Sequence, residues 1–282
     1  MLTVSICIAN YRQDHFLQEA IDSCNSQTYK NEVVVYNDTE GVGSGEAFNR
    51  AIEKATGDII ILLCSDDVFT DNMVVYDITR IFIDKPYVGH VSRYYHQFED
   101  GNRAPVRAWR NNDPIELANN PSGLAFRRRV FERGCRLTNK MFVEAPALVR
   151  CCLDKGWEYK IMKWDTVAVR IHNSTARSKD YYAKRWVSSP VEEWGKVGGQ
   201  ALLKDYTSFI QIKNYYTTMG VWKEISNFVK YRPINLLMPG FWFFALIALL
   251  TPRSILWHVP HWYRITFGRW FTREVNRDLY KV

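Results

Sequence analysis

The spacing of apolar and polar residues predicts a regular alternation of strands and helices in the first third of the chain. Apolar runs predict three strands, and apolar residues at intervals of three and four predict three helices. The strands are expected at residues 2–9, 32–36 and 59–63, and the helices at residues 14–26, 46–55 and 73–83. This order predicts an α/β domain with a parallel sheet flanked by helices and right-handed crossovers between strands.

The third predicted strand is followed by two adjacent carboxylates, Asp66 and Asp67. Its apolar residues, 59 to 63, show no alternation, which is typical of a strand buried on both faces. Ligands of open α/β sheets bind beyond the carboxyl ends of the strands. Two carboxylates there repel each other unless a cation lies between them, and their oxygen atoms suit Mg²⁺ or Mn²⁺. We therefore expect a metal-bound nucleotide here; the alternative is that Ser65 and the aspartates only cap the next helix.

A glycine-rich loop, residues 41–45, joins the second predicted strand to the second predicted helix. Its Gly-x-Gly-x-Gly spacing, after the second strand rather than the first, does not match the dinucleotide-binding pattern Gly-x-Gly-x-x-Gly. We expect a turn with Ser44 as the helix N-cap, and helix amides that help to hold a diphosphate. Bound NAD is therefore not expected.

The excess of positive charge lies in the C-terminal part. The 282 residues contain 37 Lys and Arg against 30 Asp and Glu, a net charge of +7. Residues 221–282 contain nine basic and three acidic residues, so nearly all of the excess lies there. Such a segment suits nucleic acid or an anionic membrane surface. Its apolar content, described below, favours the membrane, and no nucleic-acid partner is expected.

The six cysteines show no Cys-x-x-Cys pair and no metal-ligand spacing. We expect all of them to be reduced thiols of a cytosolic protein. The N-terminus leads directly into a predicted strand, without the basic and apolar regions of a signal peptide.

Residues 234–250 form a run of 17 residues without a charge. One helix of this length would reach about 25 Å, against about 30 Å for the hydrocarbon core of a membrane, and Pro239-Gly240 is expected to interrupt it. Tryptophans and arginines interleave after this run, as in segments that lie among lipid headgroups. We therefore predict a domain at residues 1–220 and a helical membrane-associating tail at residues 221–282; an apolar homodimer interface is the alternative.

Several short segments together resemble the inverting glycosyltransferases of family 2, which have the GT-A fold. The resemblance rests on the order and spacing of these segments rather than on any one of them. They are residues 4–11, 17–23, 27–29, 33–38, 49–58, 63–67, 121–131 and 141–156. The resemblance implies a Rossmann-like, mostly parallel sheet and a nucleotide-sugar donor, with a UDP-sugar as the first candidate.

The resemblance also implies where the nucleotide binds. Asn10 and Tyr11 would line the nucleoside pocket, and Asp38 would bond the base. Apart from the resemblance, the positive charges of Arg177 and Lys179, in a later polar loop, are expected to clamp the leaving diphosphate and stabilise the charge that develops on it. A solvated charged loop is the alternative for these two basic residues.

The metal motif of the family is Asp-x-Asp, and this chain departs from it. Cys64 stands where the family usually has the first aspartate, so Asp66 is expected to be the main ligand of Mn²⁺ or Mg²⁺. The neighbouring residue, Ser65, is expected to contact the nucleotide-sugar donor. Asp67 and His172 complete the implied ligand set, because imidazole nitrogen and carboxylate oxygen together suit Mn²⁺. A purely structural histidine is the alternative for His172.

Inversion requires a general base that takes the proton of the acceptor hydroxyl. In the family an acidic pair falls where this chain has Glu144 and Ala145, and its aspartate is the usual base. Because Ala145 replaces that aspartate, we assign the role to Glu144, with a carboxylate that only begins a helix as the alternative.

The stretch from Arg93 to Trp109 is rich in aromatic and basic residues. Such residues recognise sugars by stacking and hydrogen bonding, and a half-buried sheet face is the alternative. His96 is expected to be a surface histidine.

These features predict a metal-dependent inverting glycosyltransferase, peripheral or monotopic at the cytoplasmic face of the inner membrane. Its expected acceptor is a glycan linked to a lipid such as a polyprenyl diphosphate, in the assembly of cell-surface polysaccharide. Two alternatives remain: a degenerate transferase that binds nucleotide or glycan as a scaffold, and a soluble transferase whose tail forms a dimer.

Overall fold

The computed structural model describes residues 2–99, 102–140, 143–171, 190–199 and 218–252. The chain divides into two compact units, Met1–Val187 and Ser188–Val282, which are described separately below. The predicted domain boundary between residues 220 and 221 stays a prediction.

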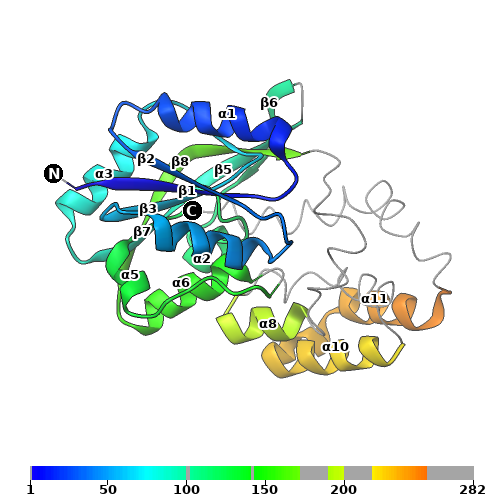
Figure 1. The fold of residues 1–282 in the computed structure, drawn as a ribbon. Coiled ribbons are helices and arrows are strands. Elements are labelled where there is room, and N and C mark those ends of the chain that lie inside the picture. The colour runs from blue at the N-terminus through cyan, green and yellow to red at the C-terminus, as the bar shows by residue number, and fades with distance from the viewer. Residues whose placement is uncertain (1, 100–101, 141–142, 172–189, 200–217, 253–282) are drawn as a thin grey trace. The chain divides into compact units, whose positions relative to one another are not determined.

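An eight-stranded sheet forms the centre of the first unit (Figure 1). Its strands are β1 (Val4–Asn10), β2 (Glu32–Asn37), β3 (Ile59–Cys64), β4 (Val68–Phe69), β5 (Val88–Glu99), β6 (Asn102–Trp109), β7 (Ala125–Arg127) and β8 (Glu158–Ile171). They follow the order β2-β1-β3-β7-β5-β8-β4, and β6 pairs with β5. The first three strands confirm the sequence prediction to within two residues at each end.

The sheet is mixed, which corrects the expectation of a mostly parallel sheet. β1 runs parallel to β2 and β3, and β5 runs parallel to β8, whereas β7, β4 and β6 are antiparallel to their neighbours. Antiparallel neighbours need no crossover helix, so the strand-helix alternation of the first third did not reveal them. Because β7 is antiparallel to both β3 and β5, the carboxyl ends of β1, β2, β3, β5 and β8 lie at the same edge.

Helices cover both faces of the sheet (Figure 1). α1 and α3 lie on one face, and α2, α5 and α6 lie on the other. The helices that the structure describes in this unit are α1 Asp14–Asn25, α2 Ser44–Lys54, α3 Val74–Asp84, α4 Pro114–Leu117, α5 Arg128–Glu132 and α6 Glu144–Asp154. The three helices predicted from periodicity are α1, α2 and α3. α1 and α2 lie on opposite faces because the crossovers from β1 to β2 and from β2 to β3 run in opposite directions.

β3 is the most deeply buried strand. Every residue from Ile59 to Leu63 is fully buried, as the unbroken apolar run predicts. Burial of one such side chain stabilises the fold by about 1.5–3 kcal/mol. The turn that follows β3 therefore begins from a firmly packed strand.

A disulfide joins Cys135, after α5, to Cys151 on α6. The expectation that all six cysteines are reduced is therefore wrong for these two. The pairing arises because the chain after α5 returns along α6, a fold-dependent proximity that cysteine spacing does not reveal. Four cysteines remain free thiols, namely Cys7, Cys24, Cys64 and Cys152.

The second unit is helical where the structure describes it. Its elements are α8 (Pro190–Val197), α10 (Thr218–Tyr231), the 3₁₀ helix η3 (Pro233–Leu237) and α11 (Pro239–Leu250). The helical run does break at Pro239, as predicted, and none of the described helices is both long and apolar enough to cross a membrane. Phe241 and Phe244 pack inward against α10 residues such as Phe228.

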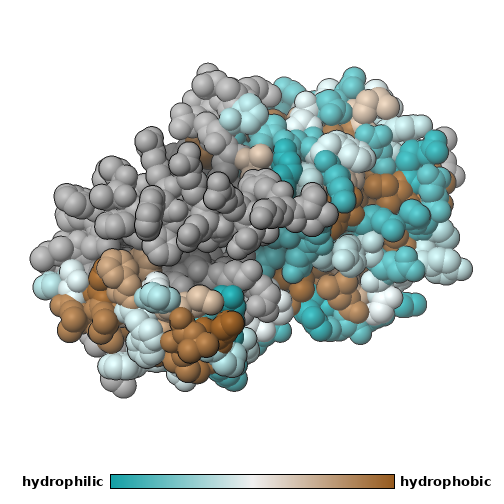
Figure 2. Space-filling view, turned by 180° about the vertical axis from the view of Figure 1, so that it is seen from behind, coloured by the Kyte–Doolittle hydropathy of each residue, from teal (hydrophilic) through white to brown (hydrophobic). Residues whose placement is uncertain are grey.

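One side of α11 and η3 exposes apolar side chains to solvent. Figure 2 shows them as brown surface at the lower left. The most exposed members are Leu237 and Leu250, at 80% and 78% of their full surface. Other exposed members are Ile234, Leu236, Trp242, Phe243 and Leu246. The tail therefore carries an apolar surface on short helices rather than on one long span.

Candidate active site

Polar residues from the ends of three parallel strands meet at one edge of the sheet. We call them the strand-end cluster: residues 10, 11, 37, 38 and 64–67. The amide of Asn10 donates to Asn37 Oδ1 at 3.1 Å and to Asp14 Oδ1 at 2.8 Å. The Oδ1 atom of Asn10 is buried and accepts no hydrogen bond from the described residues. An acceptor without a partner in this place suits a bound ligand that donates a hydrogen bond.

Tyr11 directly follows β1, at the same edge of the sheet. Its ring packs beside Gly41, where an added Cβ would meet ring atoms at 3.5 Å. The Arg12 guanidinium stands 5.1 Å from the ring centroid. Arg12 also has a positive φ of 56°, a conformation uncommon outside glycine and asparagine. The chain thus turns sharply after β1 and leaves an aromatic ring at the edge.

Asp38 fixes the glycine-rich loop. Its carboxylate accepts hydrogen bonds from the backbone N–H groups of Val42, at 2.7 Å, and Gly43, at 3.0 Å. Gly43 has φ 108° and is the residue that precedes α2. Ser44 is therefore the first residue of the helix rather than its N-cap, which corrects the prediction.

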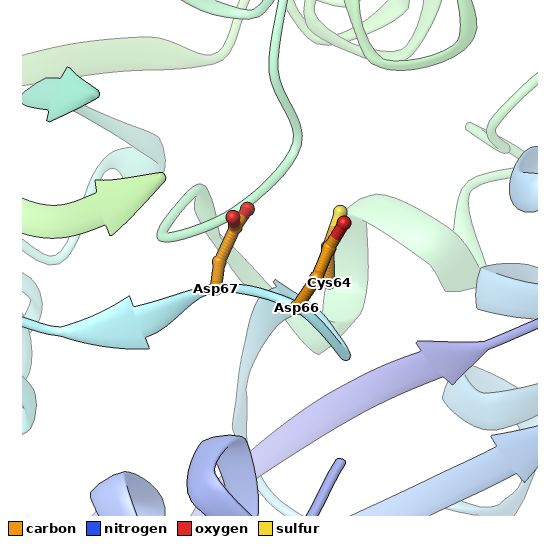
Figure 3. Close-up of side chains that lie close together, drawn as sticks. All are labelled: Cys64, Asp66 and Asp67. Atoms are coloured by element: carbon orange, nitrogen blue, oxygen red, sulfur yellow. The ribbon is translucent and has the colours of Figure 1, made fainter. Parts of the chain in front are cut away.

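Cys64, Asp66 and Asp67 come together at the turn after β3. Figure 3 shows their side chains pointing to the same side of the turn. The thiol sulfur and one oxygen of each carboxylate all lie within 4.8 Å of one another. α3 begins only at Val74, after β4, so the alternative in which these residues cap the next helix is wrong.

Two other segments of the chain hold the carboxylate of Asp67 in place. Ser122 Oγ donates to Asp67 Oδ2 at 2.5 Å and accepts from the Cys64 N–H at 2.9 Å. The backbone N–H of Arg170 donates to Asp67 Oδ1 at 3.0 Å. These hydrogen bonds fix the orientation of the carboxylate. Metal-binding side chains are commonly oriented in this way by hydrogen-bond partners that do not touch the metal themselves.

The electrostatics of the turn favour a cation. Burial, followed by the charge of Asp66, raises the pKa of Asp67 to about 8. Burial and the charges of Asp67 and Asp66 also raise the pKa of the Cys64 thiol. Negative charge is therefore costly here until a positive ion neutralises it, and the donor atoms present fit a divalent metal.

Glu144 is the first residue of α6. Its Oε1 accepts a hydrogen bond from Ser44 Oγ at 3.3 Å. Ala145 is 1% exposed, so its side chain belongs to the core. Glu144 thus both begins a helix and lies beside α2, and its catalytic role stays a prediction.

The segment before α6 interlocks with α2. Asn49 pairs with the backbone of Leu137 through two hydrogen bonds of 3.0 and 3.1 Å. Asn139 donates to Val42 O at 2.9 Å and accepts from the Glu46 N–H at 2.8 Å. We call residues 135–140 with the first turn of α6 the α6 entry.

The middle of the chain matches a known family. Residues 32–143 match the family described as Glycosyl transferase family 2. This part of the chain is therefore similar to the family 2 glycosyltransferases. This match spans the glycine-rich loop, the turn after β3 and the approach to Glu144, and it supports a glycosyltransferase activity.

Solved structures show the same fold. TarS 1–349 of S. aureus aligns with a TM-score of 0.57 at 12% identity, over 92% of each chain. Its complex with UDP-GlcNAc aligns with a TM-score of 0.54 at 13% identity, over 88% of this chain and 80% of TarS. At these identities the likeness concerns the fold alone, which is GT-A-like. No curated protein sequence matches the chain.

Three predicted site residues of the glycosyltransferase, His172, Arg177 and Lys179, lie outside the described residues. Ser65 is buried within the turn after β3. The remaining predicted donor residues all lie in the strand-end cluster.

Two residues of the predicted sugar-recognition stretch have structural contacts. Arg93 is fully buried, and its guanidinium donates to the carbonyl oxygens of Leu117 and Asn120 at 3.0 Å. His96 is half-buried, with Nδ1 3.1 Å from Asp165 Oδ2. The sheet-face alternative therefore describes both residues, and His96 is not the surface histidine expected.

Sequence reasoning missed the two residues that support the turn. Ser122 lies within residues 121–131, which carry part of the family resemblance, and Arg170 precedes His172 by two residues, but the sequence assigned neither of them a role. Besides its backbone bond to Asp67, Arg170 donates through Nε to Asp66 O at 3.1 Å. Its guanidinium lies between the rings of Phe16, at 4.4 Å, and Phe98, at 4.8 Å.

Proposed function

We propose that this protein is a metal-dependent, inverting glycosyltransferase that uses a UDP-sugar. The observation that carries the proposal is the meeting of Cys64, Asp66 and Asp67 at the end of β3, beside Asn10 and Asp38, within a family 2 domain. TarS, which shares the fold, was solved with UDP and with UDP-GlcNAc, and this supports UDP-sugars as the first donors to test.

In this proposal Asp38 and Asn10 bind the nucleoside and Tyr11 flanks it. Asp66, with Asp67 behind it, holds Mn²⁺ or Mg²⁺. The bound metal would neutralise the diphosphate and so favour its departure. Arg177, Lys179 and His172 stay candidates for the same diphosphate.

Glu144 is proposed to take the proton of the acceptor hydroxyl. The hydroxyl oxygen attacks the anomeric carbon as the bond to the diphosphate breaks, which inverts the configuration. In general, a carboxylate whose pKa lies near neutral pH is a suitable base for such a step. Its place at the start of α6, beside Ser44 and the glycine-rich loop, supports this role.

We further propose that the tail docks on the cytoplasmic face of a membrane and that the acceptor is lipid-linked. The exposed apolar side of η3 and α11 supports an interfacial attachment, since aromatic and leucine side chains partition into the headgroup region. Flotation with anionic liposomes tests this attachment. A protein that stays at the bottom of the gradient and sediments as a dimer would favour the dimerising tail.

Calorimetric titration with UDP and Mn²⁺ tests the donor site. The wild type is expected to bind UDP only with metal, and Asp66→Ala is expected to lose this binding while keeping its thermal transition. Equal binding by Asp66→Ala would overturn the metal role. UDP binding without turnover of any UDP-sugar would favour the degenerate scaffold, which the Ala145 replacement suggests.

A further inference from the structure

Cys64 offers a sulfur atom to the predicted metal site. It is the last residue of β3, and its side chain stands next to that of Asp66 (Figure 3). Its thiol is half-buried, in contrast to the fully buried thiols of Cys7 and Cys24. Its backbone N–H is fixed by Ser122 Oγ, which also bonds Asp67. One serine thus fixes both the cysteine and the carboxylate.

The donor atoms of the turn are of mixed chemical type. One sulfur and two carboxylate oxygens lie within 4.8 Å of one another. Metal bonds of about 2.0–2.3 Å separate two ligand atoms by at most about 4.5 Å, so a small inward movement of these side chains would let one ion bind all three. Mg²⁺ is bound in proteins by oxygen in octahedral geometry. A thiolate instead favours softer ions such as Zn²⁺ and Co²⁺.

We propose that Cys64 is a direct metal ligand, and that it makes this glycosyltransferase prefer a thiophilic divalent cation over Mg²⁺. On binding, the S–H bond breaks, the proton passes to solvent, and sulfur donates an electron pair to the metal. The inference rests on the metal role proposed above for Asp66. According to this inference, Cys64 gives the site a preference for thiophilic cations that a site made of carboxylates alone does not have.

Co²⁺ is the probe, because a thiolate bound to Co²⁺ produces a charge-transfer absorption in the near ultraviolet. Titration of the full chain with CoCl₂ is expected to produce this band, and Zn²⁺ is expected to remove it at far lower concentration than Mg²⁺. Cys64→Ser is expected to lose the band and to weaken Co²⁺ binding at least about tenfold, since even indirect ligand partners contribute that much. Cys24→Ala, at another free cysteine, is expected to keep both.

A second variant, Cys64→Asp, provides three carboxylates. It is expected to lose the band and to gain affinity for Mg²⁺ relative to Zn²⁺, which a merely structural cysteine would not produce. Co²⁺ binding that depends on Asp66 but shows no band, and is equal in Cys64→Ser, would overturn this inference and leave the metal role standing. No binding of Co²⁺ or Mn²⁺, with or without UDP, would overturn both.

Discussion

The strand-end cluster and the α6 entry are held in place by different means. The cluster follows three parallel strands, of which β1 and β3 are almost entirely buried. The α6 entry is held by side-chain hydrogen bonds to α2 and by one disulfide. Each region also departs from the family pattern at one residue: the cluster has Cys64 in place of the first aspartate of its motif, and the entry has Ala145 in place of the usual base. If Glu144 is the base, the catalytic acid lies one residue before its usual place, while Asp66 keeps its place in the metal motif.

The largest expected effect separates the two regions directly. Glu144→Gln removes the proposed base but keeps the size and polarity of the side chain. Transfer is expected to fall by about 10²- to 10⁴-fold, the usual contribution of general base catalysis. UDP affinity, measured by calorimetry, is expected to stay within about twofold of the wild type, a change below 0.5 kcal/mol.

Ala145→Asp is the informative companion variant. It restores the acid found in the family, but at a buried position. If Glu144 is the base, this variant does not rescue Glu144→Gln. A rescue would show that the usual aspartate position still faces the acceptor and would remove Glu144 from the mechanism.

The sheet beneath the cluster is expected to weaken in acid. His90 on β5 is buried against Phe126, with its ring nitrogens bonded to Ala125 O and Ser92 Oγ. Burial lowers the pKa of His90 to about 3, so the folded state resists a proton that the unfolded chain accepts below pH 6.5. Above pH 6.5, His90 therefore causes no loss in the free energy of unfolding. Below pH 6.5 its titration lowers that free energy, by up to about 3 kcal/mol at pH 4.

Urea denaturation at pH 7 and pH 4 measures this loss. His90→Gln keeps a hydrogen-bonding side chain that does not titrate, so its stability is expected to change less with pH. At urea concentrations above the unfolding transition, UDP binding and sugar transfer should disappear together, because the sheet supports both the strand-end cluster and the α6 entry. An equal pH dependence in wild type and His90→Gln contradicts the assignment.

The disulfide is expected to matter to the α6 entry alone. Cys135 and Cys151 are 16 residues apart, and a loop of about this length gives roughly 3 kcal/mol of stabilisation. The double variant Cys135→Ala/Cys151→Ala should lower the free energy of unfolding by about that amount and reduce transfer. UDP affinity at a temperature where the variant is folded should not change, and a matched loss of affinity would show that the entry also shapes the donor site.

The sequence predicted what local periodicity encodes. The unbroken run at Ile59–Leu63 identified a strand buried on both faces, and the acids that follow it identified the edge where the cluster forms. The partners of those acids are distant: Ser122 is 55 residues and Arg170 is 103 residues from Asp67. No local pattern encodes such pairings, because they arise only when β7, β8 and the turn meet in the sheet.

The antiparallel strands and the disulfide were missed for the same reason. β7 has three residues, too few for a recognisable period, and Cys135 meets Cys151 only after the chain returns along α6. The buried guanidinium of Arg93 shows the opposite error, because an aromatic and basic composition suggested a binding surface where the strand is in fact covered. Composition indicates chemistry, but burial decides whether that chemistry is available.

The smallest expected effect tests the interlock between the α6 entry and α2. Asn139→Ala removes the two hydrogen bonds to Val42 and Glu46, which contribute about 1 kcal/mol each. Their loss should lower kcat about three- to tenfold, or about 1 kcal/mol in the barrier, with little change in donor KM. Asn25→Ala, at the exposed end of α1, is the control and should change neither quantity. If Asn139→Ala raises donor KM as much as it lowers kcat, the interlock positions the glycine-rich loop as well as Glu144, and the two regions act as one.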